Sequence, residues 1–220
     1  MKEKEARRQK KFVQIREFRA PDSGKSGPQL TTDNPWFELA SSSRMLDVIN
    51  TYLGLWTKAT YVDEWYTPPS SSEKDRQGSQ QWHRDYNDQH LVKVFLYMRD
   101  VDEGTGPFEY VPGSADGPYR NEWPWEPLGE VYPPAEEFER RIPDSAVRTL
   151  TAPAGTLILC NTSGFHRGGF ATDTARLMGV LNYTSPAALA SLVSRNFRVD
   201  PSELPEGAPE AVRFAFSDLD

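Results

Sequence analysis

The sequence predicts an all-β fold, a sandwich or a barrel, with helices packed outside it. Aromatic residues make up 12% of the 220 residues, and 15 glycines and 18 prolines supply many potential turns. Short runs rich in β-branched, aliphatic and aromatic residues recur between turns of Gly, Pro and Asp. This combination favours strands joined by turns and disfavours a helical bundle.

The length favours a single domain over residues 1–220, large enough to bury a core without disulfides. We expect residues 1–30 and 200–220 to form flexible tails. The first tail begins with a strongly basic segment, and the second is strongly acidic. The structured part is therefore expected to lie between them.

One helix is expected ahead of the main run of strands. Serines at 41–43 can cap it, apolar residues from 45 to 53 recur at helical spacing, and Gly54 is placed to end it. The segment 60–67 has the composition of a strand, and 68–80 reads as a polar loop. The helix is expected to pack against the strands that follow.

The strongest strand pattern covers residues 91–98. Leu91, Lys93, Phe95 and Tyr97 would share one face of this strand, because alternate side chains point the same way. After a turn at 100–107, three further segments have strand character, and they are 108–112, 156–160 and 176–184.

A proline-rich and aromatic insertion at 120–134 is too long for a simple hairpin loop. Long ordered loops of this kind often form lids or binding loops. Its two tryptophans, Trp123 and Trp125, would either pack at the barrel mouth or cover a substrate.

The charge balance and the single cysteine exclude several classes of protein. The net charge is −7, which disfavours a nucleic-acid-binding role, and Cys160 alone cannot form a disulfide framework or a cysteine-based zinc cluster. The sequence lacks an apolar run of about 18 residues, and its charged N-terminus does not resemble a signal peptide. We therefore expect a cytoplasmic protein that binds neither nucleic acid nor membranes.

Two of the three histidines lie in a pattern that is typical of a metal site. His83 and Asp85 are two residues apart, so on a strand they would point to the same face. His166 follows the predicted strand 156–160 and is flanked by glycines that leave room around the imidazole. Two histidines and one carboxylate are the ligands of non-haem Fe(II) oxygenases. His90 is expected to face elsewhere, as a surface residue or one behind the ligands.

Arg176 lies ten residues after His166, where the chain returns at the start of the next strand. A returning strand would place this guanidinium close behind the metal. An arginine there could hold one carboxylate of a dicarboxylic acid that chelates the metal with its other end, because the planar guanidinium pairs with carboxylates through two bonds.

Three segments in this order resemble the phytanoyl-CoA dioxygenase (PhyH-like) family. They are QQWHRDYND, LVKVFLYMRDVDEGTGPFEYVPGS, and PAGTLILCNTSGFHRGG followed by Arg176. The resemblance implies a double-stranded β-helix, or jelly roll, of the cupin type. It also implies that Fe(II) is held by His83, Asp85 and His166, and that Arg176 binds the distal carboxylate of 2-oxoglutarate. By the same resemblance Gln81 contacts 2-oxoglutarate near its metal-binding end.

Other contacts to the cosubstrate are less constrained by the sequence. Lys93 is either a rim residue with an extended stem or a cation that contacts cosubstrate or substrate. Met178 occupies a position where relatives carry Ser or Thr, so we expect another hydroxyl, from Tyr183 or Thr156, to complete the site.

The expected function is that of a 2-oxoglutarate-dependent non-haem iron dioxygenase. It would use O₂ to oxidise a C–H bond of a small organic metabolite, most simply by hydroxylation, with release of succinate and CO₂. Two alternatives remain open, a non-redox metal-dependent isomerase of the cupin type and a metal-free jelly-roll binding module. The sequence fixes neither the substrate nor the oligomeric state.

Overall fold

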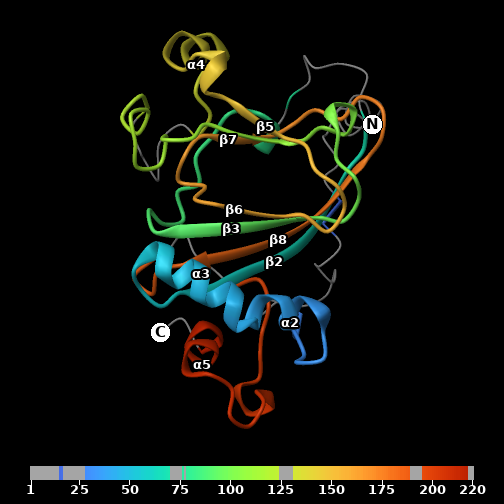
Figure 1. Cartoon of the computed structure of the whole chain (residues 1–220), viewed down its shortest axis with the longest axis vertical. Helices are drawn as coiled ribbons and strands as arrows, with labels where there is room; N and C mark the ends of the chain where they lie inside the picture. Colours follow the sequence, from blue (N-terminus) through green and yellow to red (C-terminus); the bar gives the residue numbers. More distant parts are fainter. Residues whose placement is uncertain are drawn as a thin grey trace, which may run out of the picture.

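The protein consists of two antiparallel sheets with helices outside them (Figure 1). The computed structural model describes residues 15–16, 28–69, 76, 78–123, 131–188 and 195–217. The strands are β1 (Ile15–Arg16), β2 (Lys58–Thr67), β3 (Leu91–Tyr97), β4 (Phe108–Tyr110), β5 (Arg148–Leu150), β6 (Leu157–Cys160), β7 (His166–Gly168) and β8 (Arg176–Thr184). The helices are α2 (Pro35–Ser41), α3 (Ser43–Leu53), α4 (Ala135–Arg141) and α5 (Glu210–Phe216).

The larger sheet has the strand order β1-β2-β8-β3-β6, and the smaller sheet has the order β5-β4-β7. Apart from β1 and β2, neighbours in the larger sheet are not consecutive in sequence, because the chain crosses repeatedly between the two sheets. Figure 1 shows the smaller sheet stacked over the larger one. This arrangement is the jelly roll with flanking helices that the sequence predicted.

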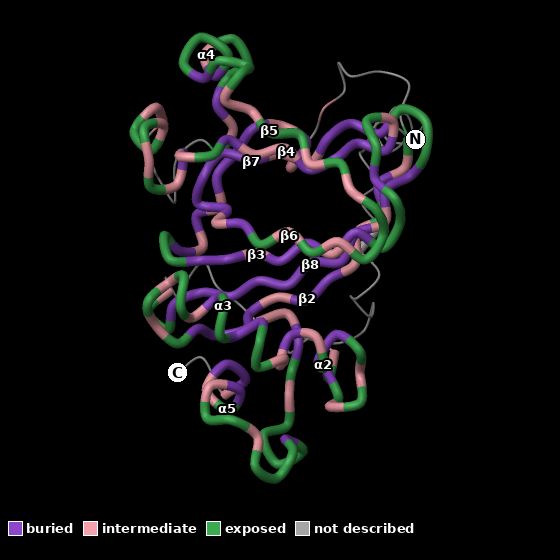
Figure 2. Tube along the Cα trace, in the orientation of Figure 1, coloured by how far each residue is buried: buried purple, intermediate pink, exposed green. Residues whose placement is uncertain are grey.

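Strand β3 lies between β8 and β6 in the larger sheet, and its two faces contact different cores. Phe95 and Tyr97 pack between the sheets with Phe108, whereas Val92 and Val94 belong to the core on the helix side. The predicted alternation along 91–98 is therefore confirmed. Burial follows the same pattern, with the interior strands buried and the outer loops exposed (Figure 2).

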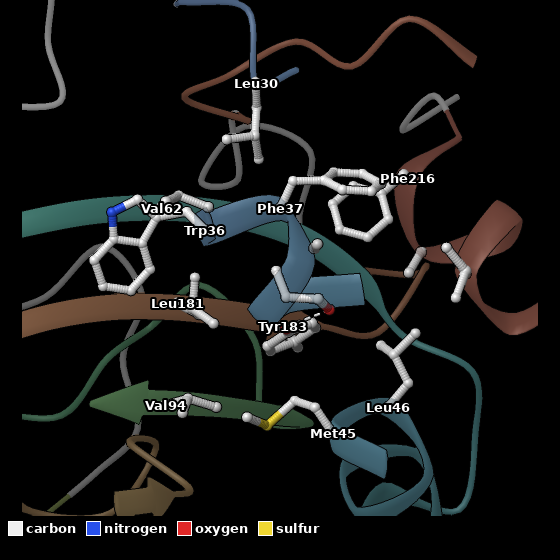
Figure 3. Close-up of a cluster of buried hydrophobic side chains, with 14 of the residues drawn as sticks. Leu30, Trp36, Phe37, Met45, Leu46, Val62, Val94, Leu181, Tyr183 and Phe216 are labelled. Carbon is white, nitrogen blue, oxygen red and sulfur yellow. Dashed lines mark hydrogen bonds between the residues drawn. The ribbon is translucent and has the colours of Figure 1, made fainter. Parts of the chain in front are cut away.

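Helices α2, α3 and α5 cover the outer face of the larger sheet (Figure 1). The predicted helix at 43–53 is α3, and Gly54 ends it with a φ of 69°, a left-handed conformation that glycine adopts without strain. Figure 3 shows the side chains that fill this layer, with Tyr183 directed from the sheet toward the helices. Within the described residues, no helix is long and apolar enough to cross a membrane.

The expectation of a flexible C-terminal tail at 200–220 is wrong for residues 201–217. Helix α5 buries Val212, Ala215 and Phe216, and the ring of Phe216 lies 4.9 Å from that of Phe37. The acidic residues of this segment are exposed while its few apolar residues are buried, so composition alone suggested a solvated tail.

The expected N-terminal tail at 1–30 lies mostly outside the described residues. Where it is described, it is ordered. Strand β1 pairs with β2, and the Leu30 N–H donates to the Arg198 carbonyl at 2.7 Å. The Leu30 side chain is fully buried in the helix-side core.

Candidate metal centre

The two candidate histidine ligands lie side by side on a short backbone bridge. His83 and His166 form an isolated antiparallel bridge, in which each N–H donates to the other's carbonyl at 3.1 and 3.0 Å. Their ring centroids are 4.2 Å apart, and the two residues are 7% and 3% exposed. His166 opens β7, a strand that the sequence did not predict.

Asp85 reaches the same place without the strand that its spacing from His83 had indicated. Its N–H donates to the Thr162 carbonyl at 2.8 Å, which ties it to the loop before His166. Its Oδ2 lies 3.5 Å from Nε2 of His166, and one ligand atom from each of the three residues lies within 4.8 Å of the others. The predicted convergence of His83, Asp85 and His166 is therefore observed.

Both imidazoles are oriented by backbone carbonyls. Nδ1 of His83 lies 2.8 Å from the Gln81 carbonyl, and Nδ1 of His166 lies 3.0 Å from the Gly164 carbonyl. A carbonyl only accepts, so in both rings Nδ1 carries the proton and Nε2 keeps a lone pair. This is the arrangement that orients histidine ligands in metal sites.

The charges of the three groups suit a divalent cation. Burial and the neighbouring His83 lower the pKa of His166 to about 3, and burial lowers the pKa of His83. Burial alone would raise the pKa of Asp85, but the Lys93 ammonium, with the two histidines, holds it well below its usual range. Near neutral pH the site thus offers two neutral imidazoles and one carboxylate.

The spacing of these groups also fits a metal ion. A first-row divalent ion with bonds of about 2.1 Å at right angles separates neighbouring ligand atoms by about 3.0 Å. The distance from Asp85 to His166 needs only a small adjustment to reach this value. The donor set is that of non-haem Fe(II) sites.

Arg176 lies beside the triad, as predicted, at the start of β8. It is 3% exposed, its Nη1 donates to the Gly106 carbonyl, and its Nε has no hydrogen-bond partner among the described residues. A Cβ on Gly168 would lie 3.0 Å from Nη2, so glycine allows the guanidinium to approach β7. Arg176 also forms no ion pair with a described carboxylate.

Arg176 and the two histidines line one small cavity of about 30 Å³. Its walls combine apolar side chains with five polar or charged ones, and Lys93 is one of these. The lining residues are Trp65, Ser79, His83, Lys93, Phe95, Phe108, His166, Gly168, Arg176 and Met178. A buried guanidinium that lacks an anionic partner among the described residues fits the distal carboxylate of 2-oxoglutarate.

The structure also places the other residues that were expected at or near the site. Lys93 is in the cavity, with its ammonium paired to Asp85 at 2.6 Å, and Gln81 contacts the site through the carbonyl that orients His83. His90 is exposed and outside the triad, as expected.

Tyr183 does not complete the cosubstrate site, because it lies on the opposite face of the larger sheet. Its hydroxyl donates to the Ala40 carbonyl in the helix layer, seen as the dashed line in Figure 3. Thr156, the other hydroxyl considered, is not among the residues that line the cavity.

The insertion at 120–134 contributes a residue that the sequence analysis did not single out. The ring of Tyr132 lies 5.7 Å from that of His83, and burial together with Asp85 raises the pKa of its hydroxyl. Trp123 packs on the cluster that contains Trp82 and Phe138, while Trp125 lies outside the described residues. The aromatic composition of the insertion was the only available signal for Tyr132.

The sequence analysis also missed Arg84, which lies between the candidate ligands His83 and Asp85. Its guanidinium donates to four carbonyls, those of Ser114, Ser163, Tyr119 and Arg120, at 2.8 to 3.3 Å, and it lies over the ring of Phe165. It thereby joins three segments: the one from His83 to Asp85, the loop after β4, and the loop before His166. The sequence carries no signal for this role, because the partners are backbone groups distant in the chain.

Two larger cavities lie at the end of the barrel near the triad. One cavity of about 330 Å³ is mainly apolar and includes Tyr110 and Cys160. These two residues pair, on neighbouring strands of their own sheets, with His166 and Lys93 respectively. The other, of about 670 Å³, is mainly polar and includes Arg84 and Trp123. The two cavities share Tyr52 and Asn161.

The fold and the site together define a jelly-roll protein with a candidate metal centre of two histidines and one carboxylate. The sequence matches no protein-family model and no curated protein. Its structure is similar to EctD from S. alaskensis, solved with 2-oxoglutarate and 5-hydroxyectoine, at a TM-score of 0.56 and 20% identity over 82% of this chain and 64% of that one.

A second similar structure is SnoN, a non-heme alpha ketoglutarate dependent epimerase from nogalamycin biosynthesis. The TM-score is 0.51, with 21% identity over 70% of this chain and 62% of that one. SnoN in complex with Fe³⁺, alpha ketoglutarate and nogalamycin RO gives a TM-score of 0.52 and 19% identity. The chain thus spans less than two thirds of the length of EctD and SnoN, and at these identities the similarity establishes the fold.

Proposed function

We propose that the protein is a non-haem iron dioxygenase that depends on Fe(II) and 2-oxoglutarate and belongs to the PhyH-like family. It would oxidise a C–H bond of a small organic metabolite, most simply by hydroxylation. One observation carries the proposal. His83 and His166 line one cavity together with Arg176, a buried guanidinium that pairs with no described carboxylate, and a ligand atom of Asp85 lies within 4.8 Å of theirs.

In this proposal His83, Asp85 and His166 hold the metal, and Arg176 binds the distal carboxylate of 2-oxoglutarate. When bound, Fe(II) with 2-oxoglutarate and O₂ supplies an oxidant strong enough for an unactivated C–H bond, and releases succinate and CO₂. The protein orients the ligands through the carbonyls of Gln81 and Gly164. Gln81 and Lys93 would supply further contacts to the cosubstrate.

The cavity walls support the same chemistry. Phe95, Phe108 and Met178 are nearly fully buried, and Trp65 closes another side. Such walls exclude water, which strengthens the pairing of Arg176 with a carboxylate and protects a reactive oxidant from quenching.

The substrate would occupy the two larger cavities at the barrel end. Together they offer an apolar compartment next to Cys160 and a polar compartment beyond Tyr52 and Asn161. A volume of several hundred Å³ suits a metabolite rather than a macromolecule. We propose accordingly that the protein acts on a small molecule. From its sequence we also propose that it is a single-domain cytoplasmic enzyme.

Arg176 distinguishes this proposal from a non-redox isomerase of the cupin type, because such an enzyme requires no clamp for a dicarboxylic acid. The intact triad distinguishes it from a binding module without metal. Both alternatives predict that 2-oxoglutarate is not consumed.

The test is succinate formation from 2-oxoglutarate with Fe(II), O₂ and ascorbate, with and without candidate substrates. Anaerobic calorimetry with Mn(II) and 2-oxoglutarate measures binding separately. We expect His83→Ala, Asp85→Ala and His166→Ala to abolish both metal binding and succinate formation. His90→Ala is the matched control for metal binding, since His90 is an exposed histidine outside the triad, and it should retain the metal. Wild-type protein that binds metal but neither binds nor consumes 2-oxoglutarate would contradict the proposal.

A further inference from the structure

Lys93 is, among the described residues, a cation paired directly with the candidate ligand Asp85. Its Nζ lies 2.6 Å from Oδ2 of Asp85, and the same oxygen lies 3.5 Å from Nε2 of His166. This oxygen therefore faces the triad and is the atom that a metal would take. The two side chains are each 14% exposed, so water screens their attraction only weakly.

The backbone at Lys93 is fixed, but its side chain is not. Lys93 pairs with Asn182 of β8 on one side and with Cys160 of β6 on the other, within the larger sheet. Its four-carbon stem can rotate about several single bonds, and an ammonium imposes no fixed geometry on its partners. Any rearrangement at this position must therefore come from the side chain.

Lys93 also limits the space available to the cosubstrate. It lines the same cavity as Arg176, and this cavity of about 30 Å³ has room for only about two or three water molecules. A five-carbon dicarboxylate does not fit into that space. Apart from Arg176, the other long side chains of the wall are aromatic rings and Met178, so Lys93 is the flexible charged group that can open it.

We propose that Lys93 and the metal ion alternate on Asp85, and that the displaced ammonium then helps to bind 2-oxoglutarate. A metal bonded to Oδ2 at about 2.1 Å would lie only about 4 Å from an ammonium that stays ion-paired to the same oxygen, and the two cations would repel each other strongly. Displacement leaves the ammonium in a cavity wall that it shares with Arg176. The metal would therefore bind first and the cosubstrate second.

A fixed structural pair makes the opposite prediction. If Lys93 kept its bond to Asp85 with metal bound, it would hold the carboxylate in the ligating position, and its removal would weaken metal binding. If the two cations alternate, removal of Lys93 leaves Asp85 without its competing cation, and metal binding becomes tighter. The inference rests on the proposed function, since it assumes that a metal and 2-oxoglutarate bind here.

The test compares Lys93→Met with the control Lys58→Met. Lys58 is a buried lysine of the larger sheet, but it contacts Ser217 and the ring of Phe214 at the end of α5, outside the cavity. Metal affinity is measured by anaerobic calorimetry with Mn(II) and with Fe(II), and 2-oxoglutarate affinity is measured with and without metal.

We expect Lys93→Met to bind Mn(II) at least about tenfold more tightly than wild type, within the usual range of coupling between two binding events. The chelator-treated variant should melt at a lower temperature than wild type and gain more on addition of metal. Its 2-oxoglutarate affinity should fall at least about tenfold, whereas Lys58→Met should leave both affinities within about twofold of wild type. Wild-type protein should bind 2-oxoglutarate only when metal is present.

Suppose that wild-type protein binds metal and 2-oxoglutarate, and that folded Lys93→Met binds metal no more tightly than wild type. This result would overturn the alternation but not the proposed function. Wild-type protein that binds no metal would instead overturn the proposed function. Lys93→Arg covers the case in which the methionine variant does not fold. It retains the competing charge, so its metal affinity should not exceed that of wild type, and a tighter affinity would contradict the inference.

Discussion

Replacement of Arg176 by methionine should make the protein more stable while removing its affinity for 2-oxoglutarate. The guanidinium is 3% exposed and is bound, among the described residues, by one carbonyl, that of Gly106. Its Nε is unsatisfied, and its charge faces no described carboxylate. Burial lowers the pKa of Arg176, which reflects the cost of keeping this charge away from water.

The magnitude follows from two opposing terms. Replacing a buried charge by an apolar side chain of similar length stabilises proteins by about 1–4 kcal/mol, and loss of the hydrogen bond to Gly106 costs about 1–2 kcal/mol. We expect a net gain of about 1–2 kcal/mol, or about 2–8 °C in melting temperature for a chain of this size. Loss of one partner of a buried ion pair costs about 3–5 kcal/mol, so affinity for 2-oxoglutarate should fall at least a hundredfold.

The assay is differential scanning calorimetry of both proteins with Mn(II), with and without 2-oxoglutarate. Wild type should gain stability from 2-oxoglutarate, and Arg176→Met should start higher and gain nothing. A variant that melts below wild type in the absence of 2-oxoglutarate would refute the idea of an uncompensated charge. A variant that binds 2-oxoglutarate within about threefold of wild type would refute Arg176 as the anchor.

Gly179→Ala would push a methyl group into the indole of Trp36, so we expect a loss of about 1–3 kcal/mol in urea unfolding, and unchanged stability would show that the ring can move aside. Burial and His83 lower the pKa of His166 from 6.5 to about 3, so the unfolded chain binds a proton at this imidazole more readily than the folded chain. The free energy of unfolding, measured with chelator present, should therefore fall as the pH drops from about 6.5 toward 3. A slope in this range that is the same for His166→Gln would argue against that assignment. Phe216→Ala removes a ring that is 1% exposed and should cost about 3–5 kcal/mol by calorimetry, whereas a tail would tolerate it.

The sequence predicted those parts of the fold that local patterns determine. Helix α3 has its apolar residues at helical spacing and a glycine at its end, and β3 alternates because each of its faces meets a different core. His83 and Asp85 were correctly expected to converge from a spacing of two residues. They do so through bonds to the His166 segment and not through a strand.

What the sequence missed depends on packing between distant segments. Helix α5 has only seven residues and an acidic first turn. A helix this short depends on tertiary packing, which the contact between Phe216 and Phe37 supplies. Strand β7 contains His166 and Gly168 and lacks strand-forming side chains, so only its pairing with β4 defines it. Arg84 binds carbonyls whose positions are set by the complete fold, and no local pattern announces it.

The backbone bridge between His83 and His166 has a consequence for the order in which the protein folds. The two residues are 83 positions apart, so the bridge closes a long loop that includes β3 to β6, and the entropy lost in this closure makes the bridge a late contact in folding. Contacts made this late are weak in the folding transition state and act mainly on the rate of unfolding. A metal bound by both imidazoles would hold the ends of this loop together. It would slow unfolding and so lengthen the lifetime of the folded chain, while the folding rate would stay almost unchanged.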